Sequence, residues 1–333
     1  MIKVGIIGSG FGLYGLLPAF NSTVGCKVIA ICGKKTERLV KYCQSIGLGK
    51  IYTSWQEMLA TEKINAVAIA VPPNAQHNII RAALRKNLHI FAEKPLALNY
   101  QQAKELLRIA TKKKITNAVD FIFPEIEAWQ KVKEMIDKKV YGKLRHISLN
   151  WDFLSYDIKN KISSWKTNTR EGGGALSYYF SHSLYYLEYL AGEITGIKSQ
   201  FFYSKESINS GEVGLDLLLS FKTGIKGYAH ISISTKVYNK HQLIFQCEKG
   251  AIILKNESGS VTDFVIKIYS EKKETKIKLK EKPKKIDEDE RVRIVKKIAA
   301  RFIYCCAHKE QMIPSFKEGV RVQELIGKIR SNL

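Results

Sequence analysis

The sequence lacks any apolar run near the roughly 18 residues that a membrane-spanning helix needs, which argues against a membrane partner. Its apolar first 20 residues have no basic n-region beyond Lys3 and no small-residue cleavage site, and five glycines interrupt them, so no signal peptide is expected. The six cysteines show neither C-x-x-C spacing nor a regular framework, which argues against a disulfide scaffold and against a metal site. We therefore expect a cytoplasmic protein with reduced thiols.

Acidic residues are scarce, with 31 Asp and Glu against 54 Lys and Arg, so the formal net charge is +23. This balance favours anionic partners, including nucleic acid, a membrane surface or phosphorylated small molecules. The basic residues are scattered except for a denser block at 271–285, where no aromatic residue is interleaved. The block suits an exposed edge strand as well as a nucleic-acid patch. Since no zinc spacing or recognition-helix signature accompanies it, we expect an edge strand and no specific nucleic-acid partner.

The length of 333 residues suggests about two domains. In the first 120 residues, short β-branched runs alternate with helical patterns. The expected strands are Lys3–Ile7, Lys27–Cys32, Lys50–Thr53, Ala66–Val71, His89–Ala92 and Thr116–Val119. The expected helices are Leu13–Phe20, Thr36–Ile46, Ala75–Lys86 and Tyr100–Lys113. This alternation predicts an α/β domain with a doubly wound parallel sheet covered on both faces.

After about residue 124 the pattern changes to longer strands. The expected elements are a helix at Glu125–Lys138, a strand at Arg145–Phe153, a helix at Ala175–Ala191, strands between Thr195 and Leu279, and helices at Glu288–Ala307 and Lys317–Ser331. They predict a second α/β domain with an open, mainly antiparallel sheet and helices on one face. We place the domains at 1–121 and 122–333, with the final helix a candidate to pack back on the first domain.

A glycine-rich turn follows the first expected strand and precedes a helix. It reads Gly8, Ser9, Gly10, Phe11, Gly12 and Leu13. Glycines let the chain turn tightly and let a pyrophosphate reach the N–H groups of the helix N-terminus. In the G-x-G-x-x-G fingerprint the third glycine falls on Leu13, so we expect altered helix packing. A tight turn without a ligand is the alternative to a dinucleotide site.

The end of the second expected strand indicates which cofactor binds. An NAD site has an acid there for the ribose 2′-hydroxyl, whereas an NADP site omits it and supplies cations. Here Gly33 stands at that position, followed by Lys34 and Lys35. We therefore expect NADP(H) to be preferred and leave NAD(H) open, with plain surface lysines as the alternative reading.

Two further segments carry reactive side chains. Glu93, Lys94 and Pro95 follow the fifth expected strand, where a doubly wound sheet binds its ligands. Three glycines then open a helix that carries Tyr178 and His182, which are four residues apart and so on one helical face.

These segments resemble the Gfo/Idh/MocA family of oxidoreductases over essentially the whole chain. The resemblance rests on the G-S-G-F-G turn, on A-V-P-P-N-A-Q-H at Ala70–His77, on E-K-P, and on the G-G-G-A-L…H helix. It implies an N-terminal Rossmann domain and a C-terminal domain whose sheet commonly forms the oligomer interface, hence a homodimer or homotetramer. It also implies reversible hydride transfer between a nicotinamide and a hydroxyl carbon of a sugar, inositol or related polyol.

The resemblance assigns roles to individual residues. Lys94 matches the catalytic lysine, which binds the reacting oxygen and moves its proton, and Glu93 would contact the cofactor ribose. His182 matches the histidine of D-x-G-x-H, a proton shuttle. The aspartate of that motif is replaced by Tyr178 and its glycine by Phe180. We expect Tyr178 to serve as a substitute acid or hydrogen-bond donor, with an aromatic packing role as the alternative.

The remaining candidates border the site. Those expected along the cofactor are Val71, Pro72, Pro73 and His77, and those expected near the substrate are Asp120, Trp165 and Lys166. Each has a structural alternative: a helix-start contact for His77, a turn cap for Asp120 and surface packing for Trp165 and Lys166. Two other functions stay open, an NAD-dependent glycosidase of the same fold and a non-catalytic nucleotide-sensing regulator.

Overall fold

The computed structural model describes residues 1–333 except 205–208, 210, 237, 272, 280–287 and 332–333. The chain divides into two compact units. The first unit contains residues 1–122 and the described part of 284–324, and the second contains the described parts of 123–283 and 325–333.

The first unit is built on a six-stranded parallel sheet in the order β3-β2-β1-β4-β5-β6. Its strands are β1 (Ile2–Ile7), β2 (Cys26–Cys32), β3 (Ile51–Tyr52), β4 (Ala66–Ile69), β5 (His89–Ala92) and β6 (Asn117–Val119). All four residues of β4 and the last three of β5 are buried, which explains why these strands are continuous apolar runs. The order confirms the doubly wound arrangement, whose ligand crevice opens beyond the carboxyl ends where the strand order reverses.

The helices of the first unit begin and end close to the expected positions. A π-helical turn (Gly12–Leu16) leads into α1 (Leu17–Asn21), and the other helices are α2 (Glu37–Ser45), α3 (Trp55–Thr61), α4 (Pro73–Arg85), α5 (Tyr100–Lys112), α9 (Val292–His308) and the first part of α10 (Phe316–Ser331). Thr36 and Asn99 cap α2 and α5 by accepting backbone N–H groups with their side chains. Helix α3 was not expected from the sequence, since its seven residues are too short for a clear helical period.

Helix α9 joins the first unit although it lies near the end of the chain. Phe302 of α9 makes edge contacts with Phe20 of α1 and Phe91 of β5, with ring centroids 6.2 and 5.7 Å apart. All three rings are fully buried. This aromatic cluster anchors the segment that carries Arg291, which borders the glycine-rich turn.

The second unit contains an eight-stranded sheet in the order β14-β13-β12-β11-β7-β10-β9-β8. Its strands are β7 (Leu144–Asp152), β8 (Ile194–Phe202), β9 (Gly214–Phe221), β10 (Lys226–Ser232), β11 (Lys240–Cys247), β12 (Gly250–Asn256), β13 (Val265–Ser270) and β14 (Lys273–Lys278). Neighbouring strands are antiparallel except β7 and β10. Strand β14 lies at the edge, so the described part of the basic block forms the expected edge strand.

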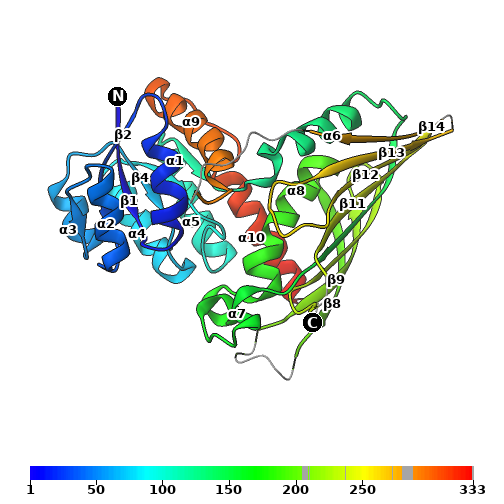
Figure 1. The fold of residues 1–333 in the computed structure, drawn as a ribbon, viewed down its shortest axis with the longest axis horizontal. Helices are drawn as coiled ribbons and strands as arrows, with labels where there is room; N and C mark the ends of the chain where they lie inside the picture. The colour runs from blue at the N-terminus through cyan, green and yellow to red at the C-terminus, as the bar shows by residue number, and fades with distance from the viewer. Residues whose placement is uncertain (205–208, 210, 237, 272, 280–287, 332–333) are drawn as a thin grey trace. The chain divides into compact units, whose positions relative to one another are not determined.

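One face of this sheet is covered by helices and the other is open. Figure 1 shows α6 (Glu127–Asp137) and α8 (Ser181–Ala191) on the same side of the sheet. Along β10, Ala229 and Ile231 are buried while Tyr228 and His230 on the alternate face are not. Leu218 and Tyr228 on that face are 58% and 38% exposed. The second sheet is thus open and mainly antiparallel, as expected.

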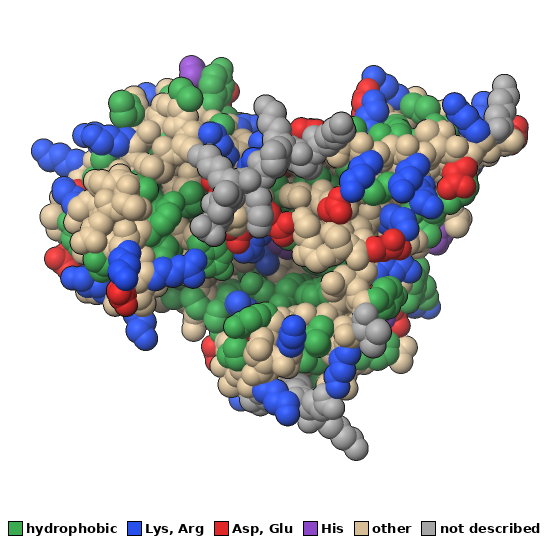
Figure 2. All heavy atoms as spheres, viewed as in Figure 1, with side chains coloured by type: hydrophobic (Ala, Val, Ile, Leu, Met, Phe, Trp, Pro, Cys, Tyr) green, Lys and Arg blue, Asp and Glu red, His purple; other side chains and the backbone are tan. Residues whose placement is uncertain are grey.

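Charge does not gather into one strong patch on the face drawn in Figure 2, where Asp and Glu lie between the Lys and Arg side chains. Among the described residues, no helix has the length and hydropathy to cross a bilayer.

Candidate functional site

The glycine-rich turn forms a cradle at the end of β1. Gly8 has φ +126°, and a Cβ there would lie 2.1 Å from the Ala70 carbonyl oxygen, so only glycine fits. A Cβ on Gly10 would meet no atom within 4 Å, which leaves open space above the turn. No side chain enters this space, and it lies at a helix N-terminus, where backbone N–H groups can bind phosphate. The turn therefore fits the pyrophosphate of a dinucleotide.

The helix after the turn departs from the glycine fingerprint. It begins as a π-helical turn, with Leu13 buried where the third glycine is usual. Gly12 is instead the residue that lies close to β1. A Cβ at this position would be 3.5 Å from the Ile6 side chain. The Phe11 ring fills the space beside Gly15, where a Cβ would lie 2.2 Å from it. The packing difference that Leu13 predicted is therefore present.

The end of β2 meets the same turn. A Cβ on Gly33 would lie 2.6 Å from the Ser9 Cβ, and the Lys34 N–H donates to Ser9 Oγ at 3.1 Å. Ser9 thus occupies the space in which a side chain at position 33 would begin. Lys34 and Lys35 are exposed, and Arg38 of α2 lies 5.9 Å from the Tyr14 ring. The segment offers cations where an NAD site has a carboxylate.

Arg291 borders the turn from the far end of the sequence. Its guanidinium carbon lies 4.3 Å from the centroid of the Phe11 ring, a cation–π contact. Nε and Nη2 donate to the two carboxylate oxygens of Asp289 at 2.9 and 2.8 Å. Sequence reasoning missed Arg291, because no motif surrounds it and only the packing of α9 brings it here.

The loop after β5 is held by a buried amide. Nε2 of Gln76 in α4 donates to the carbonyl oxygens of Glu93, Pro95 and Leu96 at 2.7, 3.0 and 3.2 Å. Gln323 of α10 donates to the carbonyl of Ala97 at 2.6 Å. The backbone on both sides of Lys94 is therefore fixed, and Gln76, which the sequence analysis did not single out, does most of the fixing.

The other residues of the Ala70–His77 segment lie at the start of α4. Pro73 is its first residue, and Val71 and Pro72 precede it, half-buried. Nε2 of His77 lies 3.0 Å from a carboxylate oxygen of Glu105 in α5, which is the helix-start contact considered as the alternative. A role of these residues along the cofactor stays a prediction.

Two carboxyl groups meet at the ends of β5 and β6. The Asp120 N–H donates to the Ala92 carbonyl at 2.9 Å, and the Lys94 N–H donates to Glu93 Oε2 at 3.1 Å. Burial, followed by the negative charge of Glu93, raises the pKa of Asp120 well above its usual range. Burial also raises the pKa of Glu93, against the opposing effect of the Lys94 charge. Asp120 is fully buried and lies beside Glu93, and its predicted place near the substrate stays a prediction.

In the second unit, Glu212 holds the start of the glycine-rich helix. The Ala175 N–H donates to its backbone oxygen at 3.0 Å, and the Leu176 N–H donates to its Oε1 at 3.0 Å. Arg330 donates to the same Oε1 at 3.1 Å and to Ser177 Oγ at 3.0 Å. Gly174, with φ +86°, leaves room for this carboxylate, since a Cβ there would lie 2.4 Å from it.

Two of the predicted substrate-side residues, Trp165 and Lys166, come together with the catalytic candidate Tyr178 at this helix. The rings of Trp165 and Tyr178 meet edge to face at 5.1 Å, and Lys166 Nζ lies 5.5 Å from the Tyr178 ring. His182 contacts Phe123 with ring centroids 5.2 Å apart. The first turn (Ala175–Phe180) is π-helical rather than α-helical, so the four-residue spacing of Tyr178 and His182 crosses a widened turn.

A pocket of about 380 Å³ opens in the second unit, which is the size of a small-ligand site. Aromatic side chains line much of it, with polar groups from three loops and strand ends. Trp151 and His241 stack at 4.4 Å and 7°. Burial lowers the pKa of His241 to about 3 and raises the pKa of Tyr179, so both are neutral near pH 7. A flat aromatic wall with neutral donors suits an uncharged polar ring.

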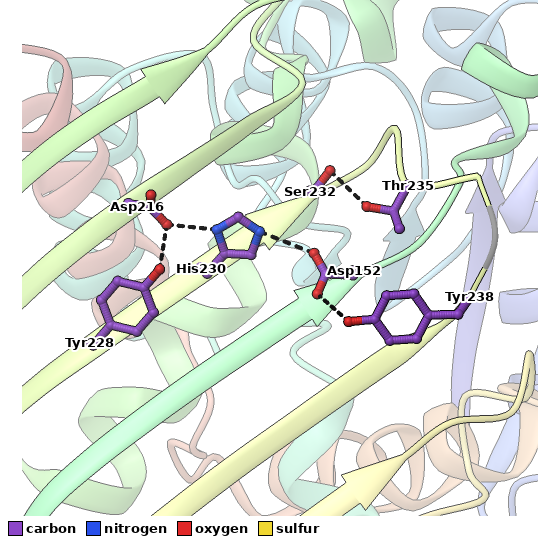
Figure 3. A network of polar contacts seen from close by, with 7 residues as sticks. All are labelled: Asp152, Asp216, Tyr228, His230, Ser232, Thr235 and Tyr238. Atoms are coloured by element: carbon purple, nitrogen blue, oxygen red, sulfur yellow. Dashed lines mark hydrogen bonds and ion pairs between the residues drawn. The ribbon is translucent and has the colours of Figure 1, made fainter.

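Asp152 lines the same pocket. Neighbouring side chains hold its carboxylate by hydrogen bonds (Figure 3). His230 lies between two acids, with Nδ1 2.6 Å from Asp216 and Nε2 3.1 Å from Asp152. Tyr238 donates to the other Asp152 oxygen at 3.4 Å. The sequence shows no motif for this network, because β7, β9 and β10 supply one residue each. His230 pairs directly with Asp216, whereas Asp152 lies two residues beyond the β7 partner of His230.

Among the described residues, no group of three or more His, Cys, Asp or Glu side chains is placed to hold a metal ion.

These features define a class: a dinucleotide-binding Rossmann unit followed by an α/β unit with a ligand pocket. Residues 2–121 match the model of an oxidoreductase family with an NAD-binding Rossmann fold, and residues 129–253 match the GFO/IDH/MocA C-terminal domain. The chain belongs to the Gfo/Idh/MocA family of oxidoreductases.

Relatives by sequence cover part of the chain. An uncharacterized oxidoreductase of Synechocystis sp. is 30% identical over 191 residues, which is 57% of this chain and 52% of the relative. The dTDP-3,4-didehydro-2,6-dideoxy-α-D-glucose 3-reductase of Actinomadura kijaniata is 27% identical over 177 residues, which is 53% and 52% of the two chains. The chain thus spans about half the length of these relatives.

Solved structures match almost the whole chain. Levoglucosan dehydrogenase in complex with NADH and levoglucosan has a TM-score of 0.85 at 17% identity, covering 99% of this chain and 96% of that one. A 3-ketoreductase from Actinomadura kijaniata in complex with NADP and TDP-benzene has a TM-score of 0.81 at 19% identity, covering 99% and 97%. At these identities the likeness establishes the fold.

The first prediction concerns Gln76. We expect Gln76→Leu to lower the free energy of unfolding by about 1–3 kcal/mol, because three loop carbonyls lose their donor. Urea unfolding measures this loss. Asn78→Leu, an exposed amide exchange on the same helix, is the control and should be near neutral. Equal stability of the two variants would contradict the role of Gln76.

The second prediction concerns Arg330. We expect Arg330→Met to lower the free energy of unfolding by about 1–3 kcal/mol, since Glu212 keeps its buried charge without the guanidinium. The guanidinium is 29% exposed, which keeps the effect below that of a fully buried pair. Thermal or urea unfolding tests it against Lys328→Met, an exposed exchange on the same helix. If Arg330→Met unfolds at the same midpoint as the wild type, Arg330 does not anchor this helix.

Proposed function

We propose that this protein is an NADP(H)-preferring oxidoreductase that transfers a hydride between a nicotinamide and a hydroxyl or carbonyl carbon of a sugar, polyol or sugar derivative. The observation that carries the proposal is the loop after β5, where Gln76 fixes the backbone around Lys94 at the ligand edge of a dinucleotide-type sheet. A bound nicotinamide dinucleotide supplies the hydride acceptor or donor. Lys94 would bind the reacting oxygen and hold or release its proton.

The preference for NADP(H) is supported by the end of β2. A 2′-phosphate carries negative charge, which Lys34, Lys35 and Arg38 can neutralise and which a carboxylate would repel. A carboxylate at position 33 would also displace Ser9. One structural neighbour contains NADH and another NADP, so the fold accommodates both forms. The lysines and the glycine of this chain favour NADP(H).

The substrate class is supported by the second unit. The aromatic wall at Trp151 suits the C–H faces of a sugar ring, and the Asp152 carboxylate can accept its hydroxyl hydrogen bonds. His182 and Tyr178 are the proposed proton-transfer groups on the same unit, with Tyr178 in place of the aspartate that the family motif has. Two neighbours named for sugar chemistry, levoglucosan dehydrogenase and a 3-ketoreductase, agree with this class.

The open face of the second sheet is the proposed surface for a homodimer or homotetramer. It carries Leu218 and Tyr228 as exposed apolar residues on neighbouring strands, whose side chains would be covered by a second copy. No nucleic acid is required by this proposal, since the basic residues are interspersed with acidic ones in Figure 2.

The third prediction tests Lys94. We expect Lys94→Ala to lower kcat at least about 100-fold, because the general acid–base group is lost, while NADPH binding changes little. Steady-state kinetics on a panel of sugars and polyols, with NADPH affinity from fluorescence titration, gives both quantities. Lys63→Ala, an exposed lysine of the first unit, is the control. Turnover at the wild-type rate without Lys94 would overturn the assignment.

The fourth prediction tests cofactor choice. We expect replacement of both Lys34 and Lys35 by Ala to raise the Kd for NADPH about tenfold or more and to leave the Kd for NADH within about threefold, because only NADPH carries the 2′-phosphate. Titration calorimetry with both nucleotides measures the ratio. Lys41→Ala in α2 is the matched control, since Lys41 is exposed and paired with Glu37. Tighter binding of NADH than NADPH by the wild type would reject the preference.

A further inference from the structure

Asp120 is a buried acid in an unusual environment. It is fully buried at the end of β6, and neither carboxyl oxygen has a hydrogen-bond donor within reach among the described residues. An ionised carboxylate in this position is poorly stabilised, because water and fixed donors are both lacking. A protonated Asp120 avoids this cost and can donate its proton to the neighbouring Glu93 carboxylate.

The charges that face this pair come from three segments of the first unit. Glu93 stands at the end of β5, Lys94 follows it, and Arg291 approaches from the segment before α9. Arg291 is itself paired with Asp289. When Asp120 is neutral, the charges of these groups cancel. One additional positive charge at this edge would leave the cluster positive, and loss of the Asp120 proton would restore the balance.

The proposed cofactor brings such a charge. In a doubly wound sheet of this order, each half binds one nucleotide at the carboxyl ends of its strands. The half formed by β1, β2 and β3 contains the glycine-rich turn and the ribose-selecting end of β2, so the half formed by β4, β5 and β6 is left for the nicotinamide. The nicotinamide ring is positively charged when oxidised and neutral when reduced.

We propose that Asp120 is a positioning residue that couples the charge of the nicotinamide ring to one proton: it stays protonated beside Glu93 when the ring is neutral and ionises when the ring is oxidised. The inference rests on the proposed function, since it needs a bound nicotinamide. Asp120 acts through Glu93 and Lys94 and makes no contact with substrate. The ionisation of Asp120 also makes the affinities for the oxidised and the reduced nucleotide respond differently to pH.

The sign of the pH effect follows from linkage. An ionised Asp120 attracts the oxidised ring, so affinity for the oxidised nucleotide rises as pH increases, whereas affinity for the reduced form changes less. The ratio of Kd for the oxidised form to Kd for the reduced form therefore falls with rising pH, by up to about tenfold per pH unit where the coupling is complete. Comparing two redox forms of one nucleotide cancels the titration of its phosphates.

The experiment is isothermal titration calorimetry of the whole chain with NADP⁺ and NADPH near pH 8, in buffers of different ionisation enthalpy. The dependence of the heat on the buffer gives the number of protons released on binding. We expect wild-type protein to release more protons with NADP⁺ than with NADPH, by up to about one per site. The variant Asp120→Asn should release equal numbers with both, because its amide still donates to Glu93 but carries no titratable proton.

Asp137→Asn is the matched control, an exposed exchange in α6 that should keep the wild-type difference in proton release. A persistent difference in Asp120→Asn, or no difference in the wild type, would overturn the inference. If Asp120→Asn does not fold, the pH dependence of the two Kd values in the wild type decides, since a constant ratio between pH 6 and 9 excludes the coupling. Failure of the wild type to bind either nucleotide would instead reject the proposed function.

Discussion

The site in the first unit depends on the hydrogen bonds that fix the loop after β5. Parallel strands bring β1, β4, β5 and β6 to one ligand edge, but the edge becomes a site only where the following loops are rigid. Gln76 supplies that rigidity, because its single amide nitrogen donates to three carbonyls in a region where water does not compete. The P-P-N-A-Q-H segment therefore supports the backbone on both sides of Lys94.

The two units contribute different physical chemistry. The first unit concentrates charge, with cations at the end of β2 and Arg291, Lys94, Glu93 and Asp120 at a buried edge. Burial makes these charges interact strongly, because little solvent screens them. The pocket of the second unit combines the stacked rings of Trp151 and His241 with the carboxylate of Asp152. We propose that the first unit binds the charged dinucleotide and that the second unit binds the polyol or sugar ring.

The replacement of the motif aspartate by Tyr178 changes how the helix near His182 is supported. Tyr178 packs against Trp165 and Lys166, an aromatic and cationic environment rather than an acidic one. The acid that anchors this helix is Glu212, which binds the backbone of its first turn from a separate segment. The helix position is thus maintained although the motif has changed.

Local patterns in the sequence predict both sheets and most of the helices and strands, since apolar periodicity, glycines and capping residues such as Thr36 and Asn99 act over a few neighbours. It also indicated the cradle at Gly8–Gly12, the cations after β2 and the position of Lys94 at a strand end. The contacts between distant groups arise only in the folded chain: Arg291 lies at Phe11, Asp120 at Glu93, and His230 between Asp152 and Asp216. These pairings follow from strand order and helix packing, and no local sequence pattern encodes them.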